Sequence, residues 1–242
     1  DSHYTTLKEM EQWAKQSGKP IDRAILHSLI AGIYADYASK NQWQIRQRAE
    51  IAGQEPAEDI REWTANMFRE KVRTNAKEAL ADSALLLKTS SETYMPFIEL
   101  GEASEYYHHD MYHLLASRSI EALQQIRRLR SKDNDLPSSP VEQDITTIYE
   151  NMISAYKTSG PKEGYILTTL NFLDWKYKPE NLYQPFLPKT GLQESESDTD
   201  PYIIALNELK KQSNSIPICA EVYLTQARYA VQKEQQVNAL QL

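Results

Sequence analysis

The sequence SPVEQDITTIYENMISAYKTSGPKEGYILTTLNFLDWKY, residues 139–177, indicates the fold class most clearly. Ser139, Pro140 and Glu142 supply a cap, a proline at the first helical position and a capping-box glutamate, so a helix is expected to begin there. Gly160-Pro161 then makes a tight turn into a second helix. The apolar residues of the two helices recur with a helical period: Ile145, Ile148, Met152 and Tyr156, then Ile166, Leu170, Leu173 and Tyr177. The segment is therefore predicted to be a helical hairpin with a short loop.

The same period continues on both sides of this hairpin. Helices are expected at Thr6–Lys15, Ile21–Tyr37, after Pro56, at Asp82–Leu87, Asp110–Arg130, and from Asp200-Pro201 and Pro217 onward. In the second of these, the predicted inward stripe is spaced four residues apart: Ile21, Ile25, Leu29, Ile33 and Tyr37. Only Asn41–Arg46 is a candidate for extended structure, and the segment from Thr89 to Tyr107 is expected to be irregular.

The C-terminal segment adds a repeat signature. Tyr223, Ala227, Ala230 and Ala239 match the spacing of bulky and small residues in a tetratricopeptide repeat, where small residues let paired helices approach closely. The chain has 7 glycines in 242 residues, which argues against a sheet-rich fold with many hairpin turns. We therefore predict an all-α fold of antiparallel helical hairpins stacked as a tetratricopeptide-like superhelix.

The domain organisation follows from one polar stretch. Residues 131–139 form a linker, so residues 1–242 make up a single helical module, or two lobes at 1–130 and 140–242. Asp1 is not an initiator Met, and the chain stops within a helical pattern at Leu242. Both ends are expected to mark a fragment of a larger chain. No apolar run approaches the roughly 20 residues that span a bilayer.

The net charge of −7, from 27 basic and 34 acidic residues, gives no basic stripe for nucleic acid. The one basic cluster, Arg127, Arg128, Arg130 and Lys132, lies at a predicted helix end, where cations favour the helix dipole. Cys219 stands among apolar neighbours and is expected to be a buried structural thiol. No phosphate loop, nucleophile elbow or Cys-x-x-Cys motif occurs, so we expect neither catalysis nor a cofactor.

Histidines form the only metal-like cluster. His109 and His113 are four residues apart and His108 is adjacent, so two rings could reach one metal if all lay on one helix. Asp110 is expected to cap the helix, which leaves His109 outside the regular turn. The prediction is therefore a solvated helix start without a metal.

Aromatic residues and one arginine are the remaining candidates. Tyr106, Tyr107, Tyr183 and Phe186 lie in or beside irregular stretches and are weak candidates for binding a partner or a sugar. The alternative is that they fill gaps between helices. Arg118 lies between Leu115 and Ala122 on an inward stripe, so we expect a buried guanidinium with a structural partner.

Three parts of the chain together resemble a known family. They are Trp43–Arg48 (WQIRQR), Asp59–Phe68 (DIREWTANMF) with Glu78–Leu86 (EALADSALL), and Met111–Ile120 (MYHLLASRSI). The last is similar to a recurring Leu-Tyr-x-x-Leu-Ala-x-Arg-Ala pattern, with Ser119 in place of the final Ala. These segments resemble the helical N-terminal region of large bacterial alpha-2-macroglobulin-like proteins.

The resemblance implies a location in the periplasm or at the outer membrane, within a protein similar to protease traps. The bait and thioester elements of such proteins are expected beyond Leu242, so no inhibitory residue is carried over. The function expected is a non-catalytic scaffold whose partners are downstream domains of the parent protein or an envelope protein. The alternative is a glycan-binding tetratricopeptide-like protein of the outer membrane, which would expose Trp platforms. A helical metalloenzyme rests only on the histidines.

Overall fold

A computed structural model describes residues 2–48, 57–98, 101, 104–129, 139–177 and 200–239. Within these ranges the chain is all-α, and its β structure is limited to one isolated bridge between Ser90 and Asp110. The helices are α1 (Ser2–Gln16), α2 (Pro20–Lys40), α3 (Gln42–Arg46), η1 (Ile60–Glu62), α4 (Ala65–Ala79), α5 (Ser83–Leu86), η2 (Ser91–Phe97), η3 (Ser104–Tyr106), α6 (Met111–Arg127), α7 (Ser139–Thr158), α8 (Lys162–Tyr177), α9 (Pro201–Ser213) and α10 (Cys219–Ala239). The predicted all-α class is confirmed for these residues. None of the helices in these ranges is long and apolar enough to cross a membrane.

Aspartate caps begin three helices where the sequence predicts them. The carboxylate oxygens of Asp82, Asp110 and Asp200 accept hydrogen bonds from the first-turn backbone amides of α5, α6 and α9, at 3.2, 2.8 and 2.9 Å. Such caps satisfy amides that have no partner within the helix. The start predicted at Thr6 is wrong, because α1 already includes Ser2 and Thr6 lies inside it.

Two further local predictions are wrong. The segment Asn41–Arg46 contains the short helix α3 rather than an extended stretch. The helix expected to follow Pro56 begins only at Ala65, after the 3-10 turn η1, and Thr64 caps it by accepting from the Met67 amide at 3.5 Å. The polar linker at 131–139 lies outside the described residues except for Ser139, which is the first residue of α7.

The chain forms two compact units, described separately below. Unit 1 comprises Asp1–Glu102 and His108–Glu150, and unit 2 comprises Ala103–Tyr107 and Asn151–Leu242. The division therefore falls inside α7 rather than in the linker region at 131–139. This division differs from the predicted lobes at 1–130 and 140–242, because the first part of α7 is hydrogen-bonded to other helices of unit 1. Asp144 accepts a hydrogen bond from Arg73 at 2.6 Å, and Glu142 accepts one from Arg127 at 2.8 Å.

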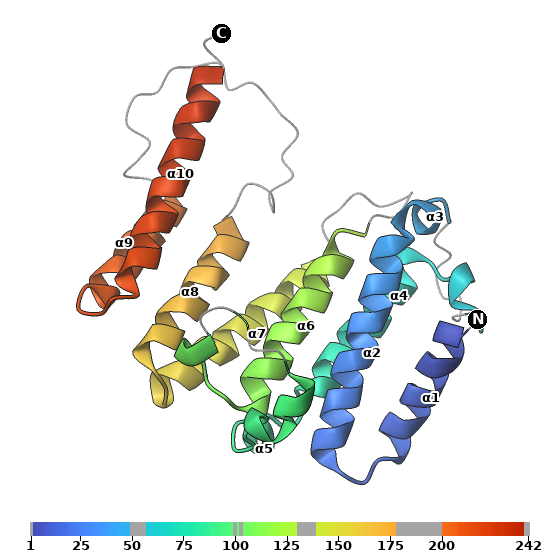
Figure 1. The fold of residues 1–242 in the computed structure, drawn as a ribbon. Coiled ribbons are helices and arrows are strands. Elements are labelled where there is room, and N and C mark those ends of the chain that lie inside the picture. Colours follow the sequence, from blue (N-terminus) through green and yellow to red (C-terminus); the bar gives the residue numbers. More distant parts are fainter. Residues whose placement is uncertain are drawn as a thin grey trace. The chain divides into compact units, whose positions relative to one another are not determined.

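Helix α2 is the centre of unit 1 and packs against α1, α4 and α6 (Figure 1). Helices α1 and α4 run antiparallel to α2, whereas α6 runs parallel to it (Figure 1). The aromatic core lies at the α2–α4 contact, where the rings of Tyr34 and Trp63 stack with centroids 5.3 Å apart and Phe68 packs at 5.3 Å from Trp63. The Tyr34 hydroxyl donates to Glu11 of α1 at 2.7 Å, which joins the first helix to this core.

The predicted inward stripe of α2 is wrong. The buried residues are instead Ala24, Ser28, Ile30, Ala31, Tyr34, Ala35 and Ala38. A spacing of exactly four residues drifts by about 40° per step around a helix of 3.6 residues per turn, so the predicted stripe leaves the buried face. Small alanines on that face let the neighbouring helices approach closely, and Leu29 is displaced to the surface with 36% of its area exposed.

Unit 2 is a layer in which α9 packs between α8 and α10. Tyr202 is at its centre: its ring meets Tyr229 edge-on at 4.8 Å, and its hydroxyl donates to Asp174. Cys219 is buried as predicted, with its thiol 3.8 Å from the Asn214 side-chain oxygen. Gly164 of α8 is buried beneath the η3 segment, where a Cβ atom would lie 2.5 Å from the carbonyl oxygen of Tyr106.

The tetratricopeptide signature does not describe packing in unit 2. Tyr223, Ala227 and Ala230 of α10 are exposed, while Val222 is buried in the core. The side chain of Ala239, the fourth matching residue, lies outside the described part. Stacked hairpins of the repeat type are therefore not seen at this position.

Candidate functional site

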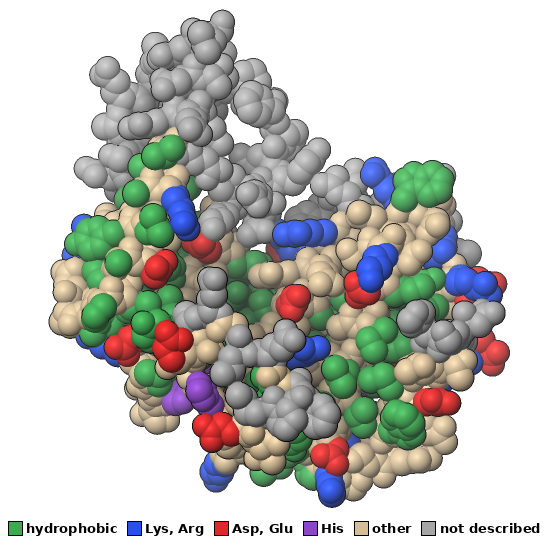
Figure 2. Space-filling model, viewed as in Figure 1, with side chains coloured by type: hydrophobic (Ala, Val, Ile, Leu, Met, Phe, Trp, Pro, Cys, Tyr) green, Lys and Arg blue, Asp and Glu red, His purple; other side chains and the backbone are tan. Residues whose placement is uncertain are grey.

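A trough with a volume of about 470 Å³ lies on unit 1 and is formed by three helices. Its floor is α2, one wall is α1 and the other wall is α6. The lining residues are Thr6 and Leu7 of α1, Ser28, Leu29, Gly32, Ile33 and Asp36 of α2, and Arg118, Glu121, Ala122 and Gln125 of α6. The volume is within the roughly 300–1,000 Å³ typical of binding pockets. Figure 2 shows that the visible face of unit 1 mixes hydrophobic side chains with basic and acidic ones.

The floor of the trough contains an unfilled position. Gly32 is in the middle of α2, and no atom lies within 4 Å of the place where its Cβ would be. Leu29 lies one turn before Gly32, and Ile33 is the residue directly after it. Both side chains are partly exposed. The floor is therefore apolar only at its centre, between Ser28 and Asp36, and it has no side chain at position 32.

Arg118 lies on the α6 wall and is exposed, so the prediction of a buried guanidinium is wrong. The buried arc of α6 is centred on Ser119, which is 1% exposed. One residue turns a helix by about 100°, which places Arg118 at the edge of that arc. Within the described part of the chain Arg118 makes no hydrogen bond or ion pair, and the same holds for Glu121, one turn further along the wall.

Other polar groups of the trough differ in their partners. Asp36 forms an exposed ion pair with Lys40 at 2.8 Å. The hydroxyl of Ser28 and the side-chain oxygen of Gln125 are buried without a hydrogen-bond partner among the described residues. The exposed charges of Arg118 and Glu121 give the α6 wall one donor group and one acceptor group for a ligand.

Among the described residues the buried arginine is Arg69, which is not one of the candidates predicted from the sequence. Arg69 on α4 is 9% exposed. Its guanidinium donates to the Asn66 side chain at 2.7 Å and to the backbone carbonyl of Leu129, just after α6. The signal was the helical spacing of Ala65, Arg69 and Val72, which puts the arginine on the buried face of α4.

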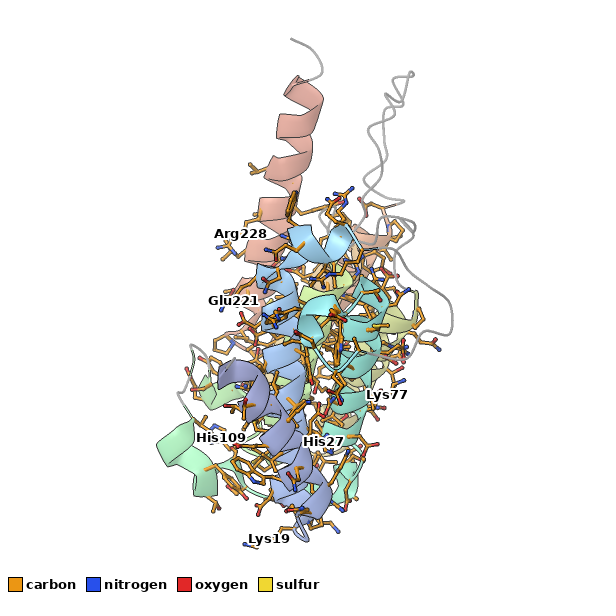
Figure 3. The ribbon with its side chains drawn as sticks, turned by 90° about the vertical axis from the view of Figure 1, so that its right-hand side faces the viewer. Lys19, His27, Lys77, His109, Glu221 and Arg228 are labelled. Atoms are coloured by element: carbon orange, nitrogen blue, oxygen red, sulfur yellow. The ribbon has the colours of Figure 1, made fainter. Side chains whose placement is uncertain are left out.

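The histidines lie at the start of α6, where His113 is buried rather than solvated. Its Nδ1 is 2.9 Å from both oxygens of Asp110, and its ring centroid is 5.0 Å from that of His108. His109 is partly exposed, with Nδ1 3.8 Å from Glu92. Figure 3 labels His109 near one edge of unit 1, with Lys77 near the opposite edge. In the described ranges no group of three His, Cys, Asp or Glu side chains is placed to hold a metal.

A second, smaller cavity of about 290 Å³ is bounded by α1, α2, α4 and α5. His27 lines it, and its Nδ1 is 2.8 Å from the side-chain oxygen of Asn75 on α4. This contact pairs the one imidazole of the cavity with an interhelical partner.

The aromatic residues predicted as weak binding candidates lie in different environments. Tyr106 and Tyr107 are half-buried and pack against the core of unit 2, and the Tyr107 hydroxyl accepts from Asn171 at 3.5 Å. Burial raises the pKa of Tyr107 above its usual value. Tyr183 and Phe186 lie outside the described residues. Trp43 and Trp13 are the most exposed large aromatics of the described part, at 73% and 53%.

Comparisons with protein-family models, curated proteins and solved structures found no match for this chain. The fold and the trough define an all-α protein with an open, mixed-charge groove on its first unit. The likeness to alpha-2-macroglobulin-like proteins stays a prediction that rests on the sequence segments alone.

Proposed function

We propose that this chain is a non-catalytic helical interaction module that binds a partner in the trough of unit 1. The observation that carries the proposal is the placement of Arg118. Its neighbours in the segment Met111–Ile120, including Tyr112, Leu115 and Ala116, are buried and serve packing. Arg118 is exposed on the trough wall without an intramolecular partner among the described residues, so its charge is available for a ligand.

The parent protein proposed from the sequence resemblance is a bacterial alpha-2-macroglobulin-like protein of the periplasm or outer membrane. In that setting the partner is a downstream domain of the parent protein or another envelope protein. The module contributes contact, and protease trapping resides in other parts of the parent protein.

The test compares the chain with two surface variants in affinity capture from bacterial envelope extracts. Arg118→Glu reverses the charge at the trough, and Lys211→Glu is a matched reversal on exposed α9. A protein retained by the wild type and by Lys211→Glu, but not by Arg118→Glu, is the expected result. The proposal is overturned if all three retain the same proteins, or if the isolated chain inhibits a protease or hydrolyses a substrate.

A glycan-binding function is the second candidate, favoured by one observation. Trp43 and Trp13 expose most of their side chains, and exposed indole rings stack on sugars. The test is a glycan array. Binding by the wild type that Trp43→Ala abolishes and Arg118→Glu leaves unchanged would favour glycan binding over partner binding in the trough.

A further inference from the structure

Helix α10 of unit 2 packs on one side and is exposed on the other. Val222 lies in the core of unit 2, and Tyr229 packs against that core. The opposite side of the helix carries an exposed apolar stripe with intervals of four, three and four residues. This α10 stripe consists of Ala220, Leu224, Ala227 and Val231. Each residue turns a helix by about 100°, so all four point within about 40° of the direction opposite Val222.

The α10 stripe has the pattern by which two helices pair. Large hydrophobic side chains are exposed at Tyr223, Leu224 and Val231, all within nine positions of one helix. The alanines of the stripe leave room for another helix to approach closely. Apolar residues at alternating intervals of three and four form the contact line of a coiled coil, where the side chains of each helix fit between those of the other.

Two opposite charges lie beside the α10 stripe, on the same flank. Glu221 and Arg228 are both exposed, and neither side chain forms a hydrogen bond or ion pair with a described residue. They are seven residues apart, which is about two turns, and Figure 3 labels both along the same side of α10. Two turns separate them by about 10 Å along the axis, so they cannot pair with each other. The flank is therefore acidic towards one end and basic towards the other.

We infer that the α10 stripe binds a second copy of this chain, with the two α10 helices antiparallel. A two-fold axis makes an interface self-complementary, because residue i contacts residue j and j contacts i. In an antiparallel pair centred between Leu224 and Ala227, each large side chain of the stripe meets an alanine of the other copy. The same register brings Glu221 of each copy close to Arg228 of the other, which pairs all four charges.

The positions of the two charges favour a second copy in this one orientation. The chain itself carries both the charged flank and its complement, so the matching charges are present on α10. In a parallel pair, Glu221 and Arg228 of different copies would stay about two turns apart along the axis and could not meet. Charge pairs beside an apolar contact line set the orientation and the choice of partner in paired helices.

The proposed interface is small, which sets the expected strength of the dimer. Stable interfaces bury about 1,200–2,000 Å², and smaller ones belong to weak, transient complexes. One stripe of four residues from each copy falls in the smaller class. The dimer should therefore be reversible, with a dissociation constant on the order of 100 µM. It involves unit 2 and does not depend on the function proposed for the trough.

Sedimentation equilibrium of the whole chain, over about two decades of concentration around 100 µM, tests the dimer. Leu224→Glu places a carboxylate in the middle of the apolar contact and should weaken dimerisation by about tenfold or more. Leu87→Glu is the matched control, because Leu87 of unit 1 has the same exposed fraction, 41%, and lies outside the stripe. Circular dichroism checks that both variants fold. A wild-type chain that stays monomeric throughout, or equal weakening in the two variants, overturns the inference.

Charge reversal tests the antiparallel register. Glu221→Arg and Arg228→Glu each place like charges opposite one another in a homodimer, so each variant alone should dimerise more weakly than the wild type. A mixture of the two single variants should form a heterodimer, because one flank is then wholly basic and the other wholly acidic. The double variant Glu221→Arg, Arg228→Glu should dimerise as the wild type does. Single variants that dimerise normally, or a loss that neither the mixture nor the double variant restores, overturn the antiparallel pairing.

Discussion

The guanidinium of Arg69 donates a hydrogen bond to the backbone carbonyl of Leu129, which joins α4 to the end of α6 inside unit 1. Arg69→Met keeps the aliphatic volume but leaves this buried carbonyl without its donor. The expected loss is about 1–3 kcal/mol of unfolding free energy. Arg118→Met is the control, because Arg118 is exposed, and it should change stability by less than about 0.5 kcal/mol. Urea denaturation measures both, and an equal loss in the two variants would contradict this assignment.

A second pair of variants tests the two helical glycines. Gly164→Ala places a methyl group 2.5 Å from the Tyr106 carbonyl and 2.6 Å from the ring of Tyr156, so it should cost about 1–3 kcal/mol by overpacking. Gly32→Ala meets no atom and should stabilise by about 0.5–1 kcal/mol through the higher helix propensity of alanine. Thermal unfolding should therefore move in opposite directions, and a loss of stability in Gly32→Ala would show that the trough floor is already filled.

The pH dependence of one exposed carboxylate follows from its partner. Hydrogen bonds from the side chain and then the backbone of Arg61 lower the pKa of Asp59 to about 2. A lowered pKa in the folded state means that the contribution to stability is present above the unfolded pKa and is lost as the pH falls towards about 2. Carboxyl-detected NMR should give this pKa for Asp59, and Arg61→Gln should raise it. A titration near the ordinary aspartate value in the wild type would rule the contact out.

The histidine segment should not retain zinc. Among the described residues no three His, Cys, Asp or Glu side chains are placed to hold a metal, and the Nε2 of His113 is buried. Purified protein should therefore contain less than stoichiometric zinc after dialysis against a weak chelator. Metal analysis of the wild type and of a His109→Ala, His113→Ala double variant checks this. Stoichiometric zinc in the wild type that disappears in the double variant would show a specific site.

Local signals predicted most of the helices, because capping depends on a few adjacent residues. Asp82, Asp110 and Asp200 could be assigned as caps from the sequence, since each carboxylate bonds an amide within its own first turn. The helix starts at Thr6 and after Pro56 could not be placed correctly. The capping-box pattern at Thr6 lies inside α1, and the cap of α4 is Thr64, eight residues after Pro56, where the acidic start was expected.

The trough could not be predicted, because it depends on which face of each helix is buried. Counting apolar residues at intervals of four placed Leu29 inward, whereas the alanine face of α2 is the one that packs. A shift of one residue around α6 separates buried Ser119 from exposed Arg118. A helix has the same period whichever of its faces is buried, so periodicity alone does not determine how the helix is oriented. The parallel pairing of α2 and α6 also joins residues about 90 positions apart, which no local pattern reveals.

Photo-crosslinking from the trough floor tests whether a partner binds there. A benzoylphenylalanine at position 29, in place of Leu29, faces the trough, and the same probe at position 43, in place of exposed Trp43, is the control. We expect a crosslink to one envelope protein or parent domain from position 29, no such crosslink from position 43, and loss of the crosslink when Arg118→Glu is added. Equal crosslinking from both positions, or a crosslink at position 29 that Arg118→Glu leaves unchanged, would contradict the claim that the trough binds the partner.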